Sequence, residues 1–213
     1  MDEVFPKVVV TLFGVIPIRD TVISTWVMMA MILAVIYLIR RTMPEALEMF
    51  IDFVSDTISD VLGRPAEPFL PFLGALMLFL LVANNLALLP FLSTPTKDIN
   101  TPLAMAVIVF FSVHYYGIRE KGALGYLKSL ATPIFMLPLE LIGQLSRTMS
   151  LTLRLFGNVL SGEFIVAVIF SLVQPIVPLV MMGLGTVTGV LQAYIFTVLA
   201  SSYIASALGD GKT

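Results

Sequence analysis

Residues 150–163 read SLTLRLFGNVLSGE and lie inside an apolar segment that runs from about Thr132 to Leu172. Arg154 stands near the middle of this segment. On insertion scales, an arginine at the centre of a membrane helix costs about 2.5–3.5 kcal/mol, and its guanidinium group stays charged at any working pH. This cost indicates that Arg154 has a function. The alternative is an arginine whose long side chain reaches back to the lipid headgroups.

The composition predicts a helical membrane protein. Of the 213 residues, 58% are hydrophobic and 12% are charged, whereas soluble domains carry about 25% charged residues. Several apolar runs approach the length of about 20 residues that a membrane-spanning helix needs. The chain has no cysteine, which excludes disulfides, thiolate metal sites and a cysteine nucleophile within it. With one histidine and no basic patch, nothing in the composition indicates a metal site or nucleic-acid binding.

Hydropathy and charge predict a single membrane domain over residues 1–213, with about five membrane helices and one amphipathic surface helix. We expect an outer N-terminal segment at residues 1–21 and a first span at 22–39. An amphipathic cytoplasmic helix is expected at 43–68, a helical hairpin at 69–118 and a tilted helix pair at 132–207. The predicted fold class is therefore an all-α integral membrane protein whose last two helices are long and steeply tilted.

Basic residues predict the orientation in the membrane. Arg40 and Arg41 close the first span, and the positive-inside rule places this end in the cytoplasm and the N-terminus outside. Seven loop cations then fall inside (Arg40, Arg41, Arg64, Arg119, Lys121, Lys128, Lys212) and three outside (Lys7, Arg19, Lys97). The C-terminus is accordingly expected in the cytoplasm.

The amphipathic segment 43–68 has apolar residues at helical spacing, with acidic residues between them. Such a helix lies along the membrane surface or packs on another protein. Because its polar side is acidic, we favour packing on a partner over binding to anionic lipid.

Two apolar segments, about 132–172 and 175–207, make up the C-terminal part of the chain. A continuous helix over the first would be about 60 Å long, twice the hydrocarbon thickness of a bilayer. It must therefore tilt steeply, kink or break. Pro133 and Pro138 are candidates for its beginning, and Pro175 and Pro178 lie at the junction with the second segment.

Glu140, Arg147 and Arg154 are spaced by seven residues, so they share one face of a helix. Ser150 and Asn158 stand four residues before and after Arg154 and widen this polar face. The three charges and two polar groups form a stripe through a segment that is otherwise apolar.

Further polar residues stand alone in apolar surroundings. Glu163 is nine residues beyond Arg154, half a helical turn away and about 13.5 Å along the axis. Gln192 on the last segment is a plausible neighbour of the arginine, and Asn84 and Asn85 end the second apolar run. Interhelical hydrogen bonds and a position of Glu163 near the outer interface are the alternatives. An acid, a fixed cation and amides at membrane depth more often mark an ion path.

At this point the residues resemble a known family. SLTLRLFGNVLSGE is similar to the signature of subunit a of the F-type ATP synthases, the membrane stator that faces the rotating c-ring. The similarity extends to LPLELIGQLSR, GVLQAYIFTVLASSYI, VANNLALLP and TKDINTPLAMA, and so covers most of the chain from about residue 70 onward.

The resemblance implies two offset half-channels and an essential arginine that couple H⁺ or Na⁺ translocation to rotation. It implies a subunit of an ATPase complex without ATP chemistry of its own and without a cofactor, in the bacterial cytoplasmic membrane. The implied partners are c-ring subunits, peripheral-stalk b subunits, other ATP synthase subunits and membrane lipid.

By the same resemblance, Arg154 matches the essential stator arginine and Glu163 the acidic residue of the outer half-channel. Gln192 matches a glutamine of the last helix, Asn158 the asparagine after the arginine, Asn84 an asparagine near the outer path and Glu140 an acidic residue toward the inner one. Some bacterial members carry a histidine seven residues before the glutamine, where this chain has Gly185.

Two other classes of function remain open. A secondary ion transporter should show inverted repeats and broken helices in matching halves, and the sequence shows no such symmetry. In a structural or assembly subunit, Arg154 would only pair with an acid of a partner, and ion coupling would survive its neutralisation.

Overall fold

The computed structural model describes residues 8–12, 16–86, 94–131, 137–172 and 176–209. Its strands are β1 (Val8–Leu12) and β2 (Ile16–Arg19). The helices are α1 (Asp20–Thr42), α2 (Pro44–Leu62), α3 (Leu70–Asn85), the 3₁₀ turn η2 (Pro95–Lys97), α4 (Asn100–Lys121), α5 (Ala123–Ala131), α6 (Leu137–Leu172) and α7 (Ile176–Leu208).

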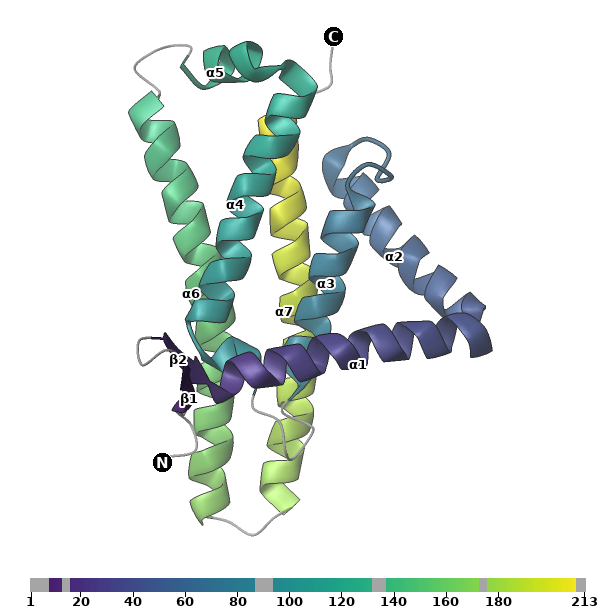
Figure 1. Ribbon diagram of the computed structural model, residues 1–213, viewed down its shortest axis with the longest axis vertical. Helices are drawn as coiled ribbons and strands as arrows, with labels where there is room; N and C mark the ends of the chain where they lie inside the picture. Colours follow the sequence, from purple (N-terminus) through teal and green to yellow (C-terminus); the bar gives the residue numbers. More distant parts are fainter. Residues whose placement is uncertain (1–7, 13–15, 87–93, 132–136, 173–175, 210–213) are drawn as a thin grey trace.

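Helices α3, α4, α6 and α7 run side by side and form the body of the molecule (Figure 1). Their shared core contains Leu73, Leu80, Leu155, Phe196 and Ile204, all fully buried. Helix α1 runs crosswise to this bundle, and α2 returns from the far end of α1 to the start of α3 (Figure 1). Helix α5 caps the end of the bundle at which α7 ends (Figure 1).

Four of the described helices, α1, α4, α6 and α7, are long and apolar enough to cross a membrane, which confirms the predicted all-helical integral membrane fold. The span expected to start at residue 69 is the apolar helix α3, which has only 16 residues and is about 24 Å long. Figure 1 shows that α1 runs crosswise to the bundle. The steep tilt expected of the last two helices in the membrane stays a prediction.

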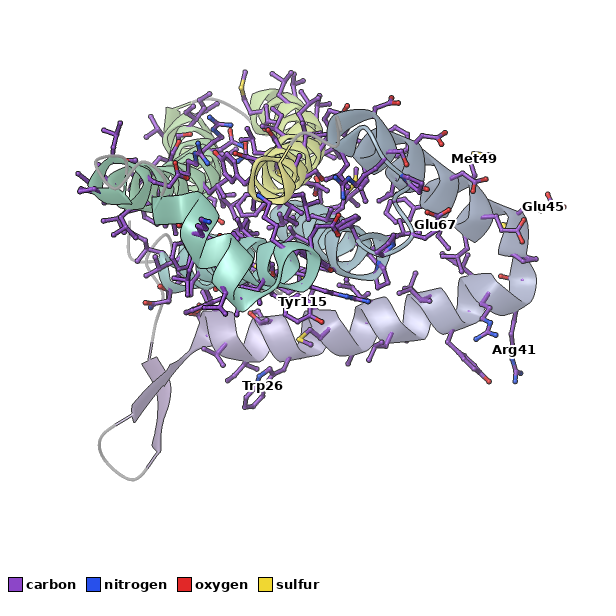
Figure 2. The ribbon with its side chains drawn as sticks, turned by 90° about the horizontal axis from the view of Figure 1, so that it is seen from above. Trp26, Arg41, Glu45, Met49, Glu67 and Tyr115 are labelled. Atoms are coloured by element: carbon purple, nitrogen blue, oxygen red, sulfur yellow. The ribbon has the colours of Figure 1, made fainter. Side chains whose placement is uncertain are left out.

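Helix α1 exposes most of its apolar side chains. Trp26 is 63% exposed and Leu33 68% exposed, and Figure 2 shows Trp26 pointing away from the bundle. Exposed apolar surface on this scale needs a lipid or protein cover. Arg41 and Glu45 lie at the opposite end, at the corner where α1 turns into α2 (Figure 2).

Helix α2 ends at Leu62, so the predicted end at residue 68 is wrong. Gly63 has a φ angle of 64°, and its N–H group bonds to the carbonyl oxygen of Ser59. Glycine adopts this left-handed conformation without steric cost and so ends the helix. Five acidic residues of the amphipathic segment fall within α2, namely Glu45, Glu48, Asp52, Asp56 and Asp60, and Glu67 follows it.

Helices α6 and α7 each have a proline in their first turn. The N–H groups of the first turn make no hydrogen bond within the helix, so a proline, which has no N–H group, is tolerated there. Pro138 is the second residue of α6, and Pro178 is the third residue of α7. The other two prolines singled out in the sequence, Pro133 and Pro175, lie outside the described residues.

The N-terminal residues form a short β-hairpin that the sequence pattern did not predict. Strand β1 pairs antiparallel with β2, with Leu12 opposite Ile16 and Val10 opposite Ile18. The hairpin projects from the start of α1, away from the bundle (Figure 2). It adds two short strands to a fold that is otherwise helical.

Candidate functional site

A cavity of about 220 Å³ lies between α4, α5, α6 and α7. Its polar lining consists of His114 and Lys121 from α4, Tyr126 from α5, Glu140, Gln144, Arg147 and Thr148 from α6, and Tyr203 and Ser206 from α7. Two charges of the predicted stripe on α6 therefore meet in one cavity with side chains from three other helices.

The cavity holds polar groups that are only partly satisfied by protein. Gln144 Nε2 donates a hydrogen bond to Glu140 Oε1 at 3.3 Å, and the guanidinium carbon of Arg147 lies 5.4 Å from the centroid of the Tyr203 ring. The buried Oε1 of Gln144 has no hydrogen-bond partner among the described residues. A polar space of this size holds several water molecules, so the cavity can hydrate Glu140.

Tyr126 forms the wall of the cavity on the α5 side. Its buried ring packs against Gly117 so closely that a Cβ atom there would overlap it, and it faces the His114 ring at 5.9 Å between centroids. Burial first, and the charge of Glu140 second, raise the pKa of Tyr126 above its ordinary value of 10. Tyr126 therefore presents a neutral hydroxyl group at physiological pH.

Gly117→Ala is expected to destabilise the junction of α4 and α5. The added methyl group displaces the buried Tyr126 ring, at a cost of about 1–3 kcal/mol. Thermal unfolding of the purified chain in detergent measures this loss. Gly125→Ala, which adds a methyl group in ordinary contact with Lys121, is the matched control.

The double variant Gly117→Ala/Tyr126→Ala tests the cause of this loss. Because the second change removes the ring that the methyl group meets, the two losses should not add. Equal unfolding temperatures for Gly117→Ala and Gly125→Ala would contradict the described packing.

A second polar cluster surrounds η2 and lies far from the cavity along α6. Glu163 in this cluster follows Glu140 by 23 residues (163 − 140) on one continuous helix, which corresponds to about 35 Å. The cluster contains four buried polar or charged residues of the η2 segment, namely Thr94, Thr96, Lys97 and Asp98.

Asn84 joins this cluster to two helices of the bundle. Its Oδ1 accepts a hydrogen bond from Thr96 Oγ1 at 3.2 Å, and its Nδ2 donates to the carbonyl oxygen of Gly189 at 3.2 Å. Asn85 instead donates to Leu81 within α3, and its buried Oδ1 has no partner among the described residues. Of the two asparagines, Asn84 thus connects α3, η2 and α7.

Glu163 is half-buried and belongs to the same cluster. It lies within electrostatic range of Lys97 and Asp20. The outer acid expected from the sequence therefore belongs to the same polar cluster as a buried lysine.

Asp98 is held in place by both of its neighbouring helices. Its Oδ2 accepts a hydrogen bond from Thr21 Oγ1 of α1 at 3.3 Å. Its Oδ1 accepts hydrogen bonds from the backbone N–H group and the side chain of Asn100, at 3.2 and 2.8 Å. Because Asn100 begins α4, the carboxylate also lies at the positive end of a helix dipole.

Arg154 lies between the two clusters and is exposed. It follows Glu140 by 14 residues and precedes Glu163 by nine, which corresponds to about 21 Å and about 13.5 Å along α6. Ser150, one turn earlier, is also exposed, and Asn158, one turn later, is half-buried. Arg147 turns into the cavity, so the predicted stripe divides between a buried and an exposed part.

Gln192 is buried, and its Nε2 has no hydrogen-bond partner among the described residues. Arg154 is exposed. That Gln192 is a neighbour of Arg154 stays a prediction.

Lys97 lies in the connection between α3 and α4, where the sequence predicts a loop, but only 6% of its surface is exposed. The segment TPTKDIN has the polar composition of an ordinary surface turn. No sequence signal marks its burial, because that burial depends on α1, α3 and α6 packing around it.

Comparisons with known proteins give a consistent result. A model of the family "ATP synthase A chain" matches residues 22–205. The "ATP synthase subunit a 2" of Bradyrhizobium sp. is 45% identical over 205 residues, 92% of each chain. That of Picosynechococcus sp. is 42% identical, over 89% of this chain and 86% of the relative. The "ATP synthase subunit a 1" of Chlorobaculum parvum is 36% identical, over 94% of this chain and 93% of the relative.

Proposed function

The chain belongs to the ATP synthase A chain family, and from this premise we propose that it is the stator subunit that couples ion flow to rotation of the c-ring. It is a multi-pass membrane protein that works with other ATP synthase subunits. We propose in addition that it has two half-channels and an essential arginine, and that the transported ion is H⁺ or Na⁺.

The order of polar groups along α6 carries the proposal. Glu140 lies in a hydratable cavity, Glu163 lies in the η2 cluster, and the exposed Arg154 stands between them. Two separate polar regions on either side of a fixed surface charge are what two offset half-channels require. We assign the cavity to the inner half-channel and the η2 cluster to the outer one.

Arg154 separates the two paths and acts on the rotor. A rotor carboxylate that reaches Arg154 is favoured in its ionised form by the opposite charge and so releases its ion. Since a guanidinium group does not lose its proton, Arg154 cannot relay protons directly between the paths. The membrane voltage supplies about 2.3 kcal/mol per charge per 100 mV for the movement.

The remaining predicted residues take supporting roles in this proposal. Ser150 and Asn158 border Arg154 on α6, and Asn84 holds the η2 segment against α7 in the outer path. Gln192 has an unused buried donor close to the exposed α7 face. Because Gly185 leaves no imidazole on α7, the outer path depends on the groups around η2.

We assign the c-ring to the exposed face formed by α6 and α7. Gly157, Gly183 and Gly185 lie on it, are exposed and have no atom within 4 Å of an added Cβ, and small residues let partner helices approach closely. The acidic side of α2 is assigned to the peripheral-stalk b subunits. The proposed location is the bacterial inner membrane, with the N-terminus outside and the C-terminus in the cytoplasm.

Single cysteines in the naturally cysteine-free chain test the two paths. In membranes with the assembled complex, Gln144→Cys should react with a charged, impermeant methanethiosulfonate from the cytoplasmic side only. Thr96→Cys should react from the opposite side only. Leu33→Cys on the lipid-exposed part of α1 is the control and should react from neither. Reaction of Gln144→Cys and Thr96→Cys from the same side would contradict the assignment of the cavity and the η2 cluster to opposite half-channels.

A further inference from the structure

His114 is the one histidine in the sequence and lines the cavity between α4, α5, α6 and α7. Its side chain is half-buried, and the proposed function gives it no role. Histidine is the side chain whose charge ordinarily changes between about pH 5 and 8. A group of this kind in the wall of an ion path can bind and release the transported ion where that ion is a proton.

A hydrogen bond to the backbone of α4 fixes the tautomer of His114. Its Nδ1 lies 2.8 Å from the carbonyl oxygen of Phe110, one turn earlier. Because a carbonyl oxygen only accepts, Nδ1 carries the hydrogen, and the lone pair of the neutral ring is on Nε2. Since Nδ1 is tied to its own helix, Nε2 points away from that backbone. His114 can therefore bind and release a proton at Nε2 without breaking its bond to Phe110.

Two aromatic rings hold the imidazole of His114 in this orientation. Its centroid lies 4.5 Å from that of Phe110 and 5.9 Å from that of Tyr126. The buried Tyr126 ring is itself packed tightly against Gly117. A ring held from two sides presents Nε2 at one place in the cavity wall, and proton transfer depends on such fixed geometry.

Glu140 and Gln144 bring hydrogen-bond acceptors of α6 into the same cavity. Glu140 Oε1 accepts a hydrogen bond from Gln144 Nε2 at 3.3 Å, and the buried Oε1 of Gln144 has no partner among the described residues. Ordered water commonly satisfies a buried oxygen of this kind. Water in the cavity can therefore connect the imidazole of α4 with the carboxyl group of α6.

The charges in the cavity favour a proton over a metal cation as the ion that crosses it. The charged and titratable groups that share the cavity with His114 come from every helix around it, namely Lys121 from α4, Tyr126 from α5, Glu140 and Arg147 from α6 and Tyr203 from α7. Lys121 Nζ donates to the carbonyl oxygen of Ala207 at 2.8 Å, and Arg147 lies over the Tyr203 ring. A metal cation would meet these two positive charges and a single carboxylate, whereas a proton moves between water and neutral imidazole.

We propose that His114 is the proton-exchanging residue of the inner path. The inference rests on the proposed function and specifies its ion as H⁺. A proton from water on the cytoplasmic side bonds to the lone pair of Nε2 and gives an imidazolium ion, while Nδ1 keeps its hydrogen. The Nε2–H bond then breaks, the proton passes to cavity water beside Glu140, and the ring is neutral again. In the direction of ATP synthesis the same steps run in reverse.

The test uses the complete ATP synthase reconstituted in liposomes, with the initial rate of ATP-driven proton pumping measured against the pH on the cytoplasmic side. A positioned proton carrier contributes about 10²–10⁴-fold to a transfer step, and cavity water replaces it in part, so His114→Ala should pump about tenfold more slowly near pH 8. At about pH 6, where hydronium ions are more abundant and an imidazole is less needed, the loss should be smaller.

Added imidazole distinguishes proton exchange from a role in packing. It should restore pumping by His114→Ala, because alanine leaves space for a free ring beside the cavity, and each rate is compared with that of the wild type in the same imidazole concentration. His114→Phe keeps an aromatic ring against Phe110 and Tyr126 but has no ring nitrogen, so it should pump slowly and should not be rescued. Tyr115→Ala, at a neighbouring side chain that is 59% exposed, is the matched control and should pump at the wild-type rate.

Normal pumping by His114→Ala at alkaline pH overturns the inference, and so does slow pumping that imidazole leaves slow. If His114→Ala fails to assemble, His114→Gln, whose amide takes up no proton, replaces it, and normal pumping by this variant has the same meaning. A wild-type complex that pumps Na⁺ and not H⁺ also overturns the inference and leaves the stator function standing. Arg154→Ala in the same liposomes tests the proposed function separately, since an inactive Arg154→Ala with an unaltered His114→Ala refutes the role of His114 alone.

Discussion

Replacing Arg154 with alanine is expected to abolish ATP-driven ion pumping by the reconstituted complex, although the complex should still assemble. Arg154 is exposed in the chain and takes part in no hydrogen bond or ion pair among the described residues, so its removal breaks no contact that holds the fold together. What the variant loses is the fixed charge that, in the proposed function, discharges the rotor carboxylate and separates the two paths. Pumping should therefore fall to background, and the passive ion leak should rise.

Arg64→Ala is the matched control for this experiment. Arg64 pairs with Glu120 at 3.0 Å, and both side chains are partly exposed to solvent. Exposed ion pairs contribute about 0–1 kcal/mol, so this variant should pump normally. If Arg154→Ala pumped ions as well as Arg64→Ala, the stator function would be ruled out. The two alternatives, a secondary ion transporter and a structural or assembly subunit, would then be considered again.

Gly189→Val is expected to prevent the chain from accumulating in a folded form. A Cβ atom at position 189 lies 3.2 Å from Asn84 Cβ and 3.2 Å from Asn85 Oδ1, and valine adds two further methyl groups. Overpacking of this kind costs about 1–3 kcal/mol. The hydrogen bond from Asn84 Nδ2 to the carbonyl oxygen of Gly189 is strained at the same time, which adds about 1 kcal/mol.

Gly185→Val is the control for the packing of α7. Gly185 lies one turn earlier on the same helix, is exposed, and has no atom within 4 Å of an added Cβ. The helix-propensity change is the same in both variants, so the difference between them isolates the close contact of α3 with α7. The measurements are the amount of chain in the membrane and its unfolding temperature in detergent. Equal values for the two variants would be incompatible with that contact.

The fold class could be predicted because it depends on local properties of the chain. The number and length of apolar runs decide whether helices can cross a membrane, and four helices of sufficient length are present. The end of α2 was predicted wrongly because a single glycine with φ of 64° stops it. The N-terminal hairpin was missed because residues 1–20 have mixed composition.

The candidate site could be predicted only in part. Arg154, Glu140 and Glu163 stand out in the sequence because charges are rare in apolar segments. Their separation into a cavity, an exposed position and a buried cluster does not follow from spacing. Arg147 shares the seven-residue spacing with Arg154 but lines the cavity, because α4, α5 and α7 pack around this part of α6. Arg154, two turns further along, is exposed.

By itself, the sequence determined the membrane class of the protein, the family to which it belongs and the fixed charge at Arg154, since hydropathy, motif and the permanent charge of arginine are properties of residues close together in the chain. The packing of distant segments was needed to show that Lys97 is buried, that Gln192 is buried while Arg154 is exposed, and that side chains from four helices line a cavity with Glu140 among them. Burial and electrostatic neighbourhood depend on which distant segments pack together, and no short stretch of sequence contains that information.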